Sequence, residues 1–253
     1  SSTTLPGGQT VVTGTFFGKA QNFALAGAHT LVAGKFDSAG AGAVGLAVSR
    51  PGLDEVALLH GQGNGAFNPV PSISVAAGPT ALAVANYDND GSPTDDLAIG
   101  NFASDDAYVF LSNGLNSFPS SNGPYGAGDG PTAAVAAPFD GNGPGIAVAN
   151  TTDATVSVFV NDGFGALVPK ATHPVGTAPV AIASGGFNPD AFPDLVVANS
   201  GDDTVTVMLL DSDSNLLVPS VTYLVGDAPS SVAAADLNGD TFPDLVVTNK
   251  GSN

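Results

Sequence analysis

Short apolar runs, separated by glycine and proline, recur along the whole chain, and no stretch carries the 3.6-residue periodicity of an amphipathic helix. One type of run, rich in leucine, valine and alanine, recurs at intervals of 51, 49, 49 and 50 residues. Its copies begin at Leu46, Leu97, Ile146, Leu195 and Leu245. A second marker, a proline before a run of small residues, stands at Pro79, Pro131, Pro179 and Pro229. Self-similarity at this fixed period predicts an array of like structural units or a propeller.

Each repeat predicts four β-strands. The first is alanine-rich and apolar on both faces, as in residues 81–85, which suits a crowded inner strand near a central axis. The second is the leucine and valine run, and the third alternates apolar and polar residues, as in residues 155–160. The fourth is poorer in apolar residues, which is typical of an outer edge strand. We expect these fourth strands to end at Gly78, Gly128, Gly176 and Gly226.

The two ends of the chain are incomplete in complementary ways. The C-terminal repeat stops after its second strand, and the N-terminal segment begins without strands one and two. We therefore predict one all-β domain over residues 1–253, a five-bladed β-propeller of four-stranded blades closed by a hybrid blade. The predicted blades cover about 28–78, 79–130, 131–177 and 178–227, with 228–253 plus 1–27 as the hybrid. A fragment of a larger ring is the alternative.

The loop between the first and second strands carries the candidate chemistry. In residues 236–244, oxygen-bearing side chains stand at relative positions 1, 3, 5 and 9, and position 7 offers a backbone carbonyl. These positions are Asp236, Asn238, Asp240, Asp244 and, at position 7, Phe242. Calcium takes about 6–8 hard oxygen ligands, which such a loop supplies. The pattern predicts a calcium site, and the alternative is a solvated Asp/Asn turn.

Residues 187–195 and 236–245 resemble the calcium loops of the FG-GAP/VCBS repeat family. The resemblance covers essentially the whole chain and implies an integrin-α-like propeller. Carried over by position, it also implies weaker calcium loops at 86–96 and 186–194. Their ligands would be Asn86, Asp88, Asp90 and Asp96, and Asn188, Asp190 and Asp194. The loops at 138–145 and 35–45 lack ligands at key positions, and we expect them to be metal-free turns.

Charge excludes several classes of partner. The chain carries 5 basic and 23 acidic residues, a net charge of −18. Nucleic-acid binding needs a basic stripe to meet phosphates, and five basic residues do not make one. There is no cysteine, which removes disulfides and thiol chemistry. No apolar run approaches the ~20 residues of a membrane-spanning helix, so no membrane span is expected.

These features favour a binding protein over an enzyme. The strands expected at the axis carry alanine, valine, serine and glycine, and no Ser/His/Asp constellation recurs. We expect an extracellular or cell-surface, calcium-binding module for binding or adhesion, with a protein or glycan as its ligand. A carbohydrate-binding lectin and a structural module of a surface layer or filament are the alternatives. Ligand contacts are expected on loops that differ between blades, with Tyr125 as the candidate residue.

Overall fold

The computed structural model describes residues 2–4, 10–12, 23–37, 44–190, 192–210 and 217–252, and the side chains of 2–4, 10–12 and 217–220 lie outside this description. The fold is all-β, with one short 3₁₀ turn at Pro51–Leu53. Within the described residues no helix is long and apolar enough to cross a membrane.

Four antiparallel sheets of four strands follow one another along the chain, each strand pairing with its sequence neighbour. Sheet 1 contains β3 (Leu31–Gly34), β4 (Gly45–Arg50), β5 (Glu55–Gly61) and β6 (Phe67–Ser74). Sheet 2 contains β7 (Pro79–Ala85), β8 (Asp96–Asn101), β9 (Asp106–Leu111) and β10 (Ser120–Gly126). Sheet 3 contains β11 (Pro131–Ala137), β12 (Gly145–Asn150), β13 (Thr155–Asn161) and β14 (Leu167–Pro174). Sheet 4 contains β15 (Pro179–Gly185), β16 (Asp194–Asn199), β17 (Thr204–Leu210) and β18 (Leu217–Leu224).

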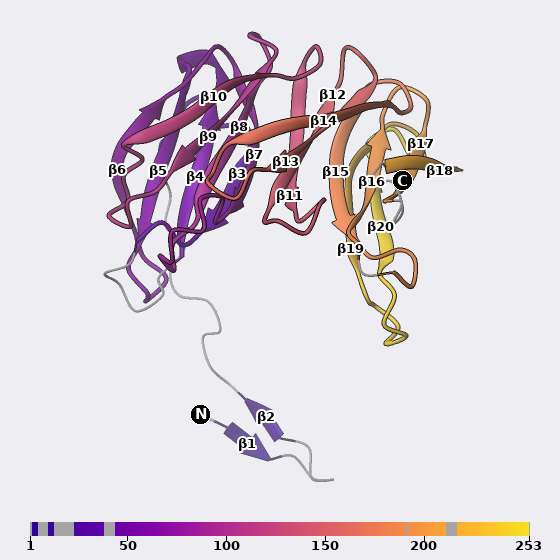
Figure 1. The fold of residues 1–253 in the computed structure, drawn as a ribbon. Coiled ribbons are helices and arrows are strands. Elements are labelled where there is room, and N and C mark those ends of the chain that lie inside the picture. The colour runs from indigo at the N-terminus through magenta and orange to yellow at the C-terminus, as the bar shows by residue number, and fades with distance from the viewer. Residues whose placement is uncertain are drawn as a thin grey trace.

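The last strands form a two-stranded sheet 5, β19 (Pro229–Ala235) with β20 (Asp244–Asn249). The sheets stand side by side in an arc that runs from β3–β6 to β19–β20 (Figure 1). First strands pack against first strands, in the series β3, β7, β11, β15 and β19. This confirms the four-strand repeat and the inner position of the first strand. The architecture is propeller-like.

The core lies between the sheets. Every residue of β8, β12 and β16 is buried. These second strands are flanked by other strands of their own sheet, and the adjacent sheets cover both of their faces. Between sheets 3 and 4, for example, Val156 and Val158 pack with Leu195, Val197 and Met208. The alternation of the third strand therefore places one set of side chains between neighbouring sheets, as its period of two predicts.

The fourth strands end earlier than the sequence pattern predicts. β6, β10, β14 and β18 end at Ser74, Gly126, Pro174 and Leu224, before the expected glycines. Those glycines lie in the links between sheets, for two physical reasons. Gly78 has a φ of +72°, in the left-handed region that favours glycine. A Cβ on Gly176 would lie 2.6 Å from the Asn199 side chain, so the link passes too close for any side chain.

We expect Gly176→Ala to destabilise the fold by about 1–3 kcal/mol, because the added methyl group must displace the buried Asn199 side chain. Gly186→Ala is the matched control, since a Cβ there meets nothing within 4 Å. Urea unfolding of the two variants measures the difference. Equal midpoints would show that the link accommodates a side chain at Gly176.

Sheet 5 leaves an apolar face at the end of the arc. On this face Tyr223 and Val221 of β18 are 51% and 46% exposed. A groove of about 500 Å³ lies on this face, between β17, β18 and β20. In the complete sheets, third and fourth strands cover the corresponding surface. The face therefore has the chemistry of an interface between two sheets.

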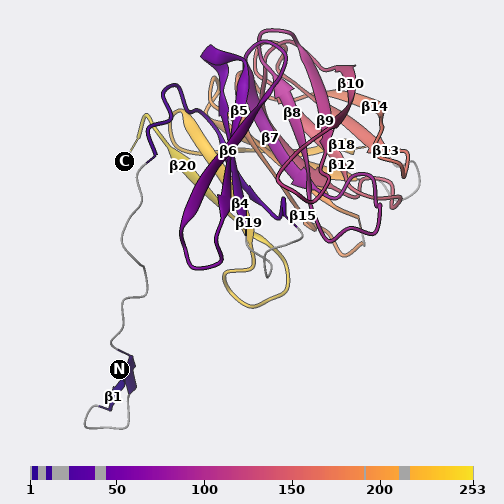
Figure 2. The ribbon, with the colours of Figure 1, turned by 90° about the vertical axis from the view of Figure 1, so that its left-hand side faces the viewer.

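The predicted closure of the ring is not confirmed. β1 (Ser2–Thr4) pairs with β2 (Thr10–Val12), and this hairpin lies apart from the five sheets in both views (Figures 1 and 2). Sheet 5 contains β19 and β20 alone among the described residues. The rest of the segment expected to complete it, residues 5–9 and 13–22, lies outside the described part of the chain.

Candidate metal loops

The loop at 236–244 is built from side chains that accept hydrogen bonds from the loop's own backbone. The two Asp236 carboxylate oxygens accept the N–H groups of Gly239 and Thr241 at 2.6 and 2.9 Å. Asn238 Oδ1 accepts the N–H of Asp240, and Asp240 Oδ1 accepts that of Phe242. These bonds curl the backbone tightly, and Thr241 has a φ of +78°, which a β-branched residue rarely adopts.

Three of the four predicted ligand side chains in this loop converge. Asn238 Nδ2 lies 3.1 Å from Asp240 Oδ2 and 3.3 Å from Asp244 Oδ1, so the amide bridges two carboxylates. Asp236 faces the backbone, and the N–H groups of Gly239 and Thr241 hold the pKa of its exposed carboxyl below the usual value. The Asp240 and Asp244 carboxylates and the loop carbonyls supply oxygens that fit calcium, and Asn238 would join them by turning its amide oxygen toward the carboxylates.

The loop at 86–96 shows the same turn chemistry, and its final aspartate, Asp96, is buried. Asp88 Oδ1 accepts the N–H of Asp90, and Asp90 Oδ1 accepts that of Ser92. Asn86 Oδ1 accepts the N–H of Asn89, while its amide donates to the Ser92 carbonyl. This loop has two more residues before its final acid than the loop at 236–244, and one of the residues there, Asp95, is a rival ligand by sequence. Asp95 accepts the N–H of Lys35 at 2.6 Å. Asp95 therefore joins this loop to sheet 1 and does not turn toward the predicted ligands.

Asp96 is buried and bonded at both carboxylate oxygens. Oδ2 accepts the N–H of Tyr87 at 2.7 Å, and Oδ1 accepts that of Ser112 at 2.8 Å. Burial raises the pKa of Asp96, and the nearby charge of Asp88 adds to that rise, although the two N–H groups oppose it. The carboxylate thus ties the start of the loop to the end of the third strand.

Asp194 repeats this arrangement in the loop at 186–194. Its oxygens accept the N–H groups of Phe187 at 2.7 Å and Leu210 at 2.9 Å, and the residue is completely buried. Burial raises the pKa of Asp194, and the Asp190 charge contributes. Asn188 and Asp190 form the turn, each accepting the backbone N–H two residues ahead. The last acid of these two loops therefore has a structural role that its predicted place in a metal loop does not reveal.

The loop at 138–145 has no such acid. A Cβ on Gly145 would overlap the Phe159 carbonyl oxygen, so no side chain fits at the final position. Asn161, at the end of β13, donates its amide to the carbonyl oxygens of Tyr87 and Pro144. The remaining Asp140 and Asn142 bond to each other. In the loop at 35–45, residues 38–43 lie outside the described part of the chain.

Across the described residues, no group of three or more carboxylates and imidazoles is placed to hold a metal ion by itself. The loop at 236–244 is consistent with this, because its convergent set contains an amide and two carboxylates. Any ion there would depend on loop carbonyls and water for the remaining ligands.

Tyr87, in the loop at 86–96, and Tyr125, which lies on β10 and not on a loop as predicted, both pack between sheets 2 and 3. Tyr87 is completely buried in the cluster between sheets 2 and 3, and burial raises the pKa of its hydroxyl. The Tyr125 ring packs on Phe159 with centroids 6.3 Å apart, and its hydroxyl accepts the N–H of Leu167 at 3.0 Å. These contacts give Tyr125 a role in holding sheets 2 and 3 together. Ligand contact by Tyr125 stays a prediction.

Residues 186–247 match the family model of the FG-GAP-like repeat, which confirms the predicted resemblance there: this part of the chain is an FG-GAP-like repeat. No curated protein matches the sequence at a significant level. The matched segment contains the loops at 186–194 and 236–244 with the sheet between them.

Several solved structures share the fold at low sequence identity. A protein of unknown function from Desulfotomaculum acetoxidans is 14% identical, with a TM-score of 0.63, and the match covers 88% of this chain and 62% of that one. BBS1N, solved in complex with ARL6DN, is 13% identical with a TM-score of 0.62, covering 87% and 62%. A candidate 6-phosphogluconolactonase from Bacteroides fragilis is 16% identical with a TM-score of 0.60, covering 88% and 58%. The chain thus spans about three fifths of each structure's length, and identities this low show the fold alone.

Proposed function

We propose that this chain is a calcium-stabilised β-propeller that acts outside the cell or at its surface as a binding or adhesion module. The observation that carries the proposal is the convergence of Asn238, Asp240 and Asp244 in a loop wound by its own Asx hydrogen bonds. With Asp236 and the Phe242 carbonyl, these residues would hold calcium. The ion would neutralise part of the net charge of −18 and fix the link between β19 and β20.

The loops at 86–96 and 186–194 are proposed as weaker calcium sites. Their turn side chains, Asp88 and Asp90 or Asn188 and Asp190, present oxygens at the same spacing. Asp96 and Asp194 are buried and held at both carboxylate oxygens by backbone N–H groups, whereas Asp236 and Asp240 of the last loop are exposed and reachable by an ion. We therefore order the three loops by affinity with 236–244 first.

The proposal excludes an enzyme on the basis of the acids. Catalytic carboxylates usually show perturbed pKa values in an accessible cleft. Among the described residues, the carboxyls with raised pKa values are Asp96 and Asp194, and both are buried and bonded to backbone N–H groups. Burial in these structural positions accounts for the raised pKa values without a catalytic role. The similarity to a candidate lactonase supports the fold alone, and it identifies no active-site residue in this chain.

A screen against matrix proteins and glycans, run beside a panel of hydrolase substrates, tests this function. We expect saturable binding that weakens when calcium is chelated, and no turnover. Turnover of a substrate that is abolished by changing one carboxylate outside the calcium loops would overturn the proposal.

The finer architecture is part of the same proposal. We propose that residues 1–27 supply the third and fourth strands to residues 228–253, which closes a ring of five blades. Sheet 5 has two strands where the others have four, and the face beside it is apolar and exposed. A strand edge and an apolar face left open together promote aggregation.

Deleting residues 1–20 is expected to cause aggregation or unfolding, because it would leave the β20 edge and the groove on sheet 4 permanently uncovered. Size-exclusion chromatography with light scattering and a thermal melt measure both outcomes. A deletion variant that is monomeric and as stable as the parent chain would remove the argument for closure by this segment.

A further inference from the structure

A groove of about 680 Å³ opens between sheets 1 and 2, on the outer side of the arc. Leu58, Val70 and Phe110 contribute apolar lining, and β6 and the segment at 115–121 contribute most of the rest. This volume lies within the range of about 300–1,000 Å³ that is typical of ligand pockets. The groove is separate from the candidate metal loop at 236–244.

The groove exists because two residues that close the next interface are replaced here. Between sheets 2 and 3, Asn122 Nδ2 donates to the Gly165 carbonyl and the Tyr125 hydroxyl accepts the N–H of Leu167. Strand register identifies the equivalent residues of sheet 1. Asn122 and Tyr125 pair with Val109 and Ala107 of β9, as Val70 and Ile73 pair with Leu58 and Val56 of β5. Val70 and Ile73 are too short and too apolar to make these bridges.

The far wall of the groove is held in place from sheet 1. The segment between β9 and β10 has eight residues, whereas the one between β13 and β14 has five. The N–H of Asn116 donates to the Phe36 carbonyl at 3.0 Å, and Asp37 bridges to Leu115. The Phe118 ring meets Phe36 edge-on at 5.6 Å. The longer segment is therefore fixed before any ligand arrives.

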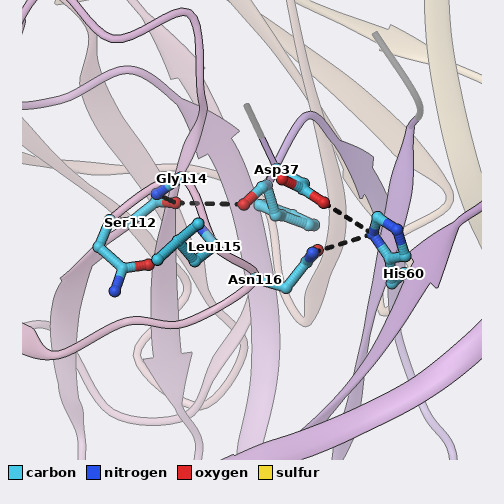
Figure 3. A network of polar contacts seen from close by, with 8 residues as sticks. Asp37, His60, Ser112, Gly114, Leu115 and Asn116 are labelled. Carbon is cyan, nitrogen blue, oxygen red and sulfur yellow. Dashed lines mark hydrogen bonds and ion pairs between the residues drawn. The ribbon is translucent and has the colours of Figure 1, made fainter. Parts of the chain in front are cut away.

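A polar contact between the two sheets stands at the end of this groove (Figure 3). His60 Nδ1 lies 2.9 Å from the Asn116 amide and 3.4 Å from Asp37 Oδ2. Asn116 and His60 both line the groove, while Asp37 lies behind them. The contact fixes the orientation of one imidazole and one amide, two groups that can donate or accept hydrogen bonds to a ligand.

The lining chemistry selects an uncharged, hydroxyl-bearing ligand. Besides His60 and Asn116, the polar residues that line the groove are Ser72, Ser74, Ser117, Ser120 and Ser121. No Asp, Glu, Lys or Arg is among the described residues that line the groove. Hydroxyl and amide groups above apolar residues match a sugar ring, which has hydroxyls at its rim and an apolar face.

The neighbouring strand edges disfavour a peptide bound by strand addition. β6 carries Pro69 and Pro71, and β10 carries Pro124 with Pro119 just before it. Proline has no N–H to donate to an added strand, and it is a common guard of exposed edges. We propose that the groove between sheets 1 and 2 binds a short neutral oligosaccharide. This rests on the proposed function as a binding module and names its ligand class and site.

The test fills the groove with the residue that closes the next interface. The folded chain and its Ile73→Tyr variant are screened on an array of neutral oligosaccharides, and hits are titrated by calorimetry. The matched control is His173→Tyr, which makes the same residue at the equivalent position of sheet 3, where His173 pairs with Val156. Asn116→Ala is a second variant that removes a polar group without filling the space.

We expect Ile73→Tyr and Asn116→Ala each to weaken glycan binding by at least about tenfold, and His173→Tyr to leave it unchanged. Two results would overturn the groove: no neutral oligosaccharide binds, or binding is equal in all four proteins. Calcium-dependent binding of a protein ligand together with no binding of any neutral oligosaccharide would overturn the glycan site and leave the proposed function intact.

Discussion

Replacing Asp194 with alanine is expected to lower the free energy of unfolding by about 2–6 kcal/mol. The carboxylate accepts the N–H groups of Phe187 and Leu210 in a completely buried position. Its removal leaves the buried N–H of Leu210 and the partly buried N–H of Phe187 without a partner, at up to about 1–3 kcal/mol each. Because whole domains are stable by only about 5–15 kcal/mol, the change would take a large share of the total.

Asp190→Ala is the matched control for this prediction. Asp190 belongs to the same loop but is exposed, and its carboxylate accepts one N–H, that of Phe192. Denaturant unfolding is measured with a chelator present, so that loss of a bound metal does not contribute to either value. An effect of Asp194→Ala no greater than that of Asp190→Ala would show that the buried carboxylate does not hold the loop to the third strand.

Calcium is expected to raise the thermal midpoint of the chain. A ligand that binds only the folded state at about 100 times its Kd stabilises that state by about 2.7 kcal/mol. For a chain of this size, each kcal/mol raises the midpoint by roughly 2–4 °C. The physical reason is local: Asp240 and Asp244 bring two carboxylates to one amide, and a cation between them would replace repulsion with attraction.

The control for calcium stabilisation is Asp240→Ala, which removes one convergent carboxylate and leaves Asp236 and Asp244 in place. Thermal melts with excess calcium and with chelator are compared for both proteins. We expect the gap between the two melts to shrink in the variant. If the parent chain melts at the same temperature with excess calcium and with chelator, the loop is a solvated turn and not a calcium site.

The strand pattern was predictable from the sequence because it depends on local rules. The proline and leucine markers stand at or next to the start of β7, β8, β11, β12, β15, β16, β19 and β20. Those strands alternate or are buried on both faces as their residues require. The ends of the fourth strands were not predictable. Glycines after them, such as Gly176, are required by close contact with residues distant in sequence, such as Asn199.

The candidate site was predictable as a set of positions and less so as a set of roles. Spacing alone places Asp96 and Asp194 in metal loops. It does not reveal that each also accepts an N–H from the end of the third strand, Ser112 or Leu210, 16 residues away. Likewise, Tyr125 follows a variable polar segment in sequence, yet its hydroxyl bonds to Leu167 of the next sheet, 42 residues away. Such contacts depend on how the sheets pack.

The most direct test of calcium stabilisation is a calorimetric calcium titration of the chain after exhaustive chelation, repeated on Asp240→Ala. The account predicts saturable binding with at least one ion per chain, and loss of the tightest site in the variant. Absence of calcium binding, or a tightest site that Asp240→Ala leaves unchanged, would contradict it.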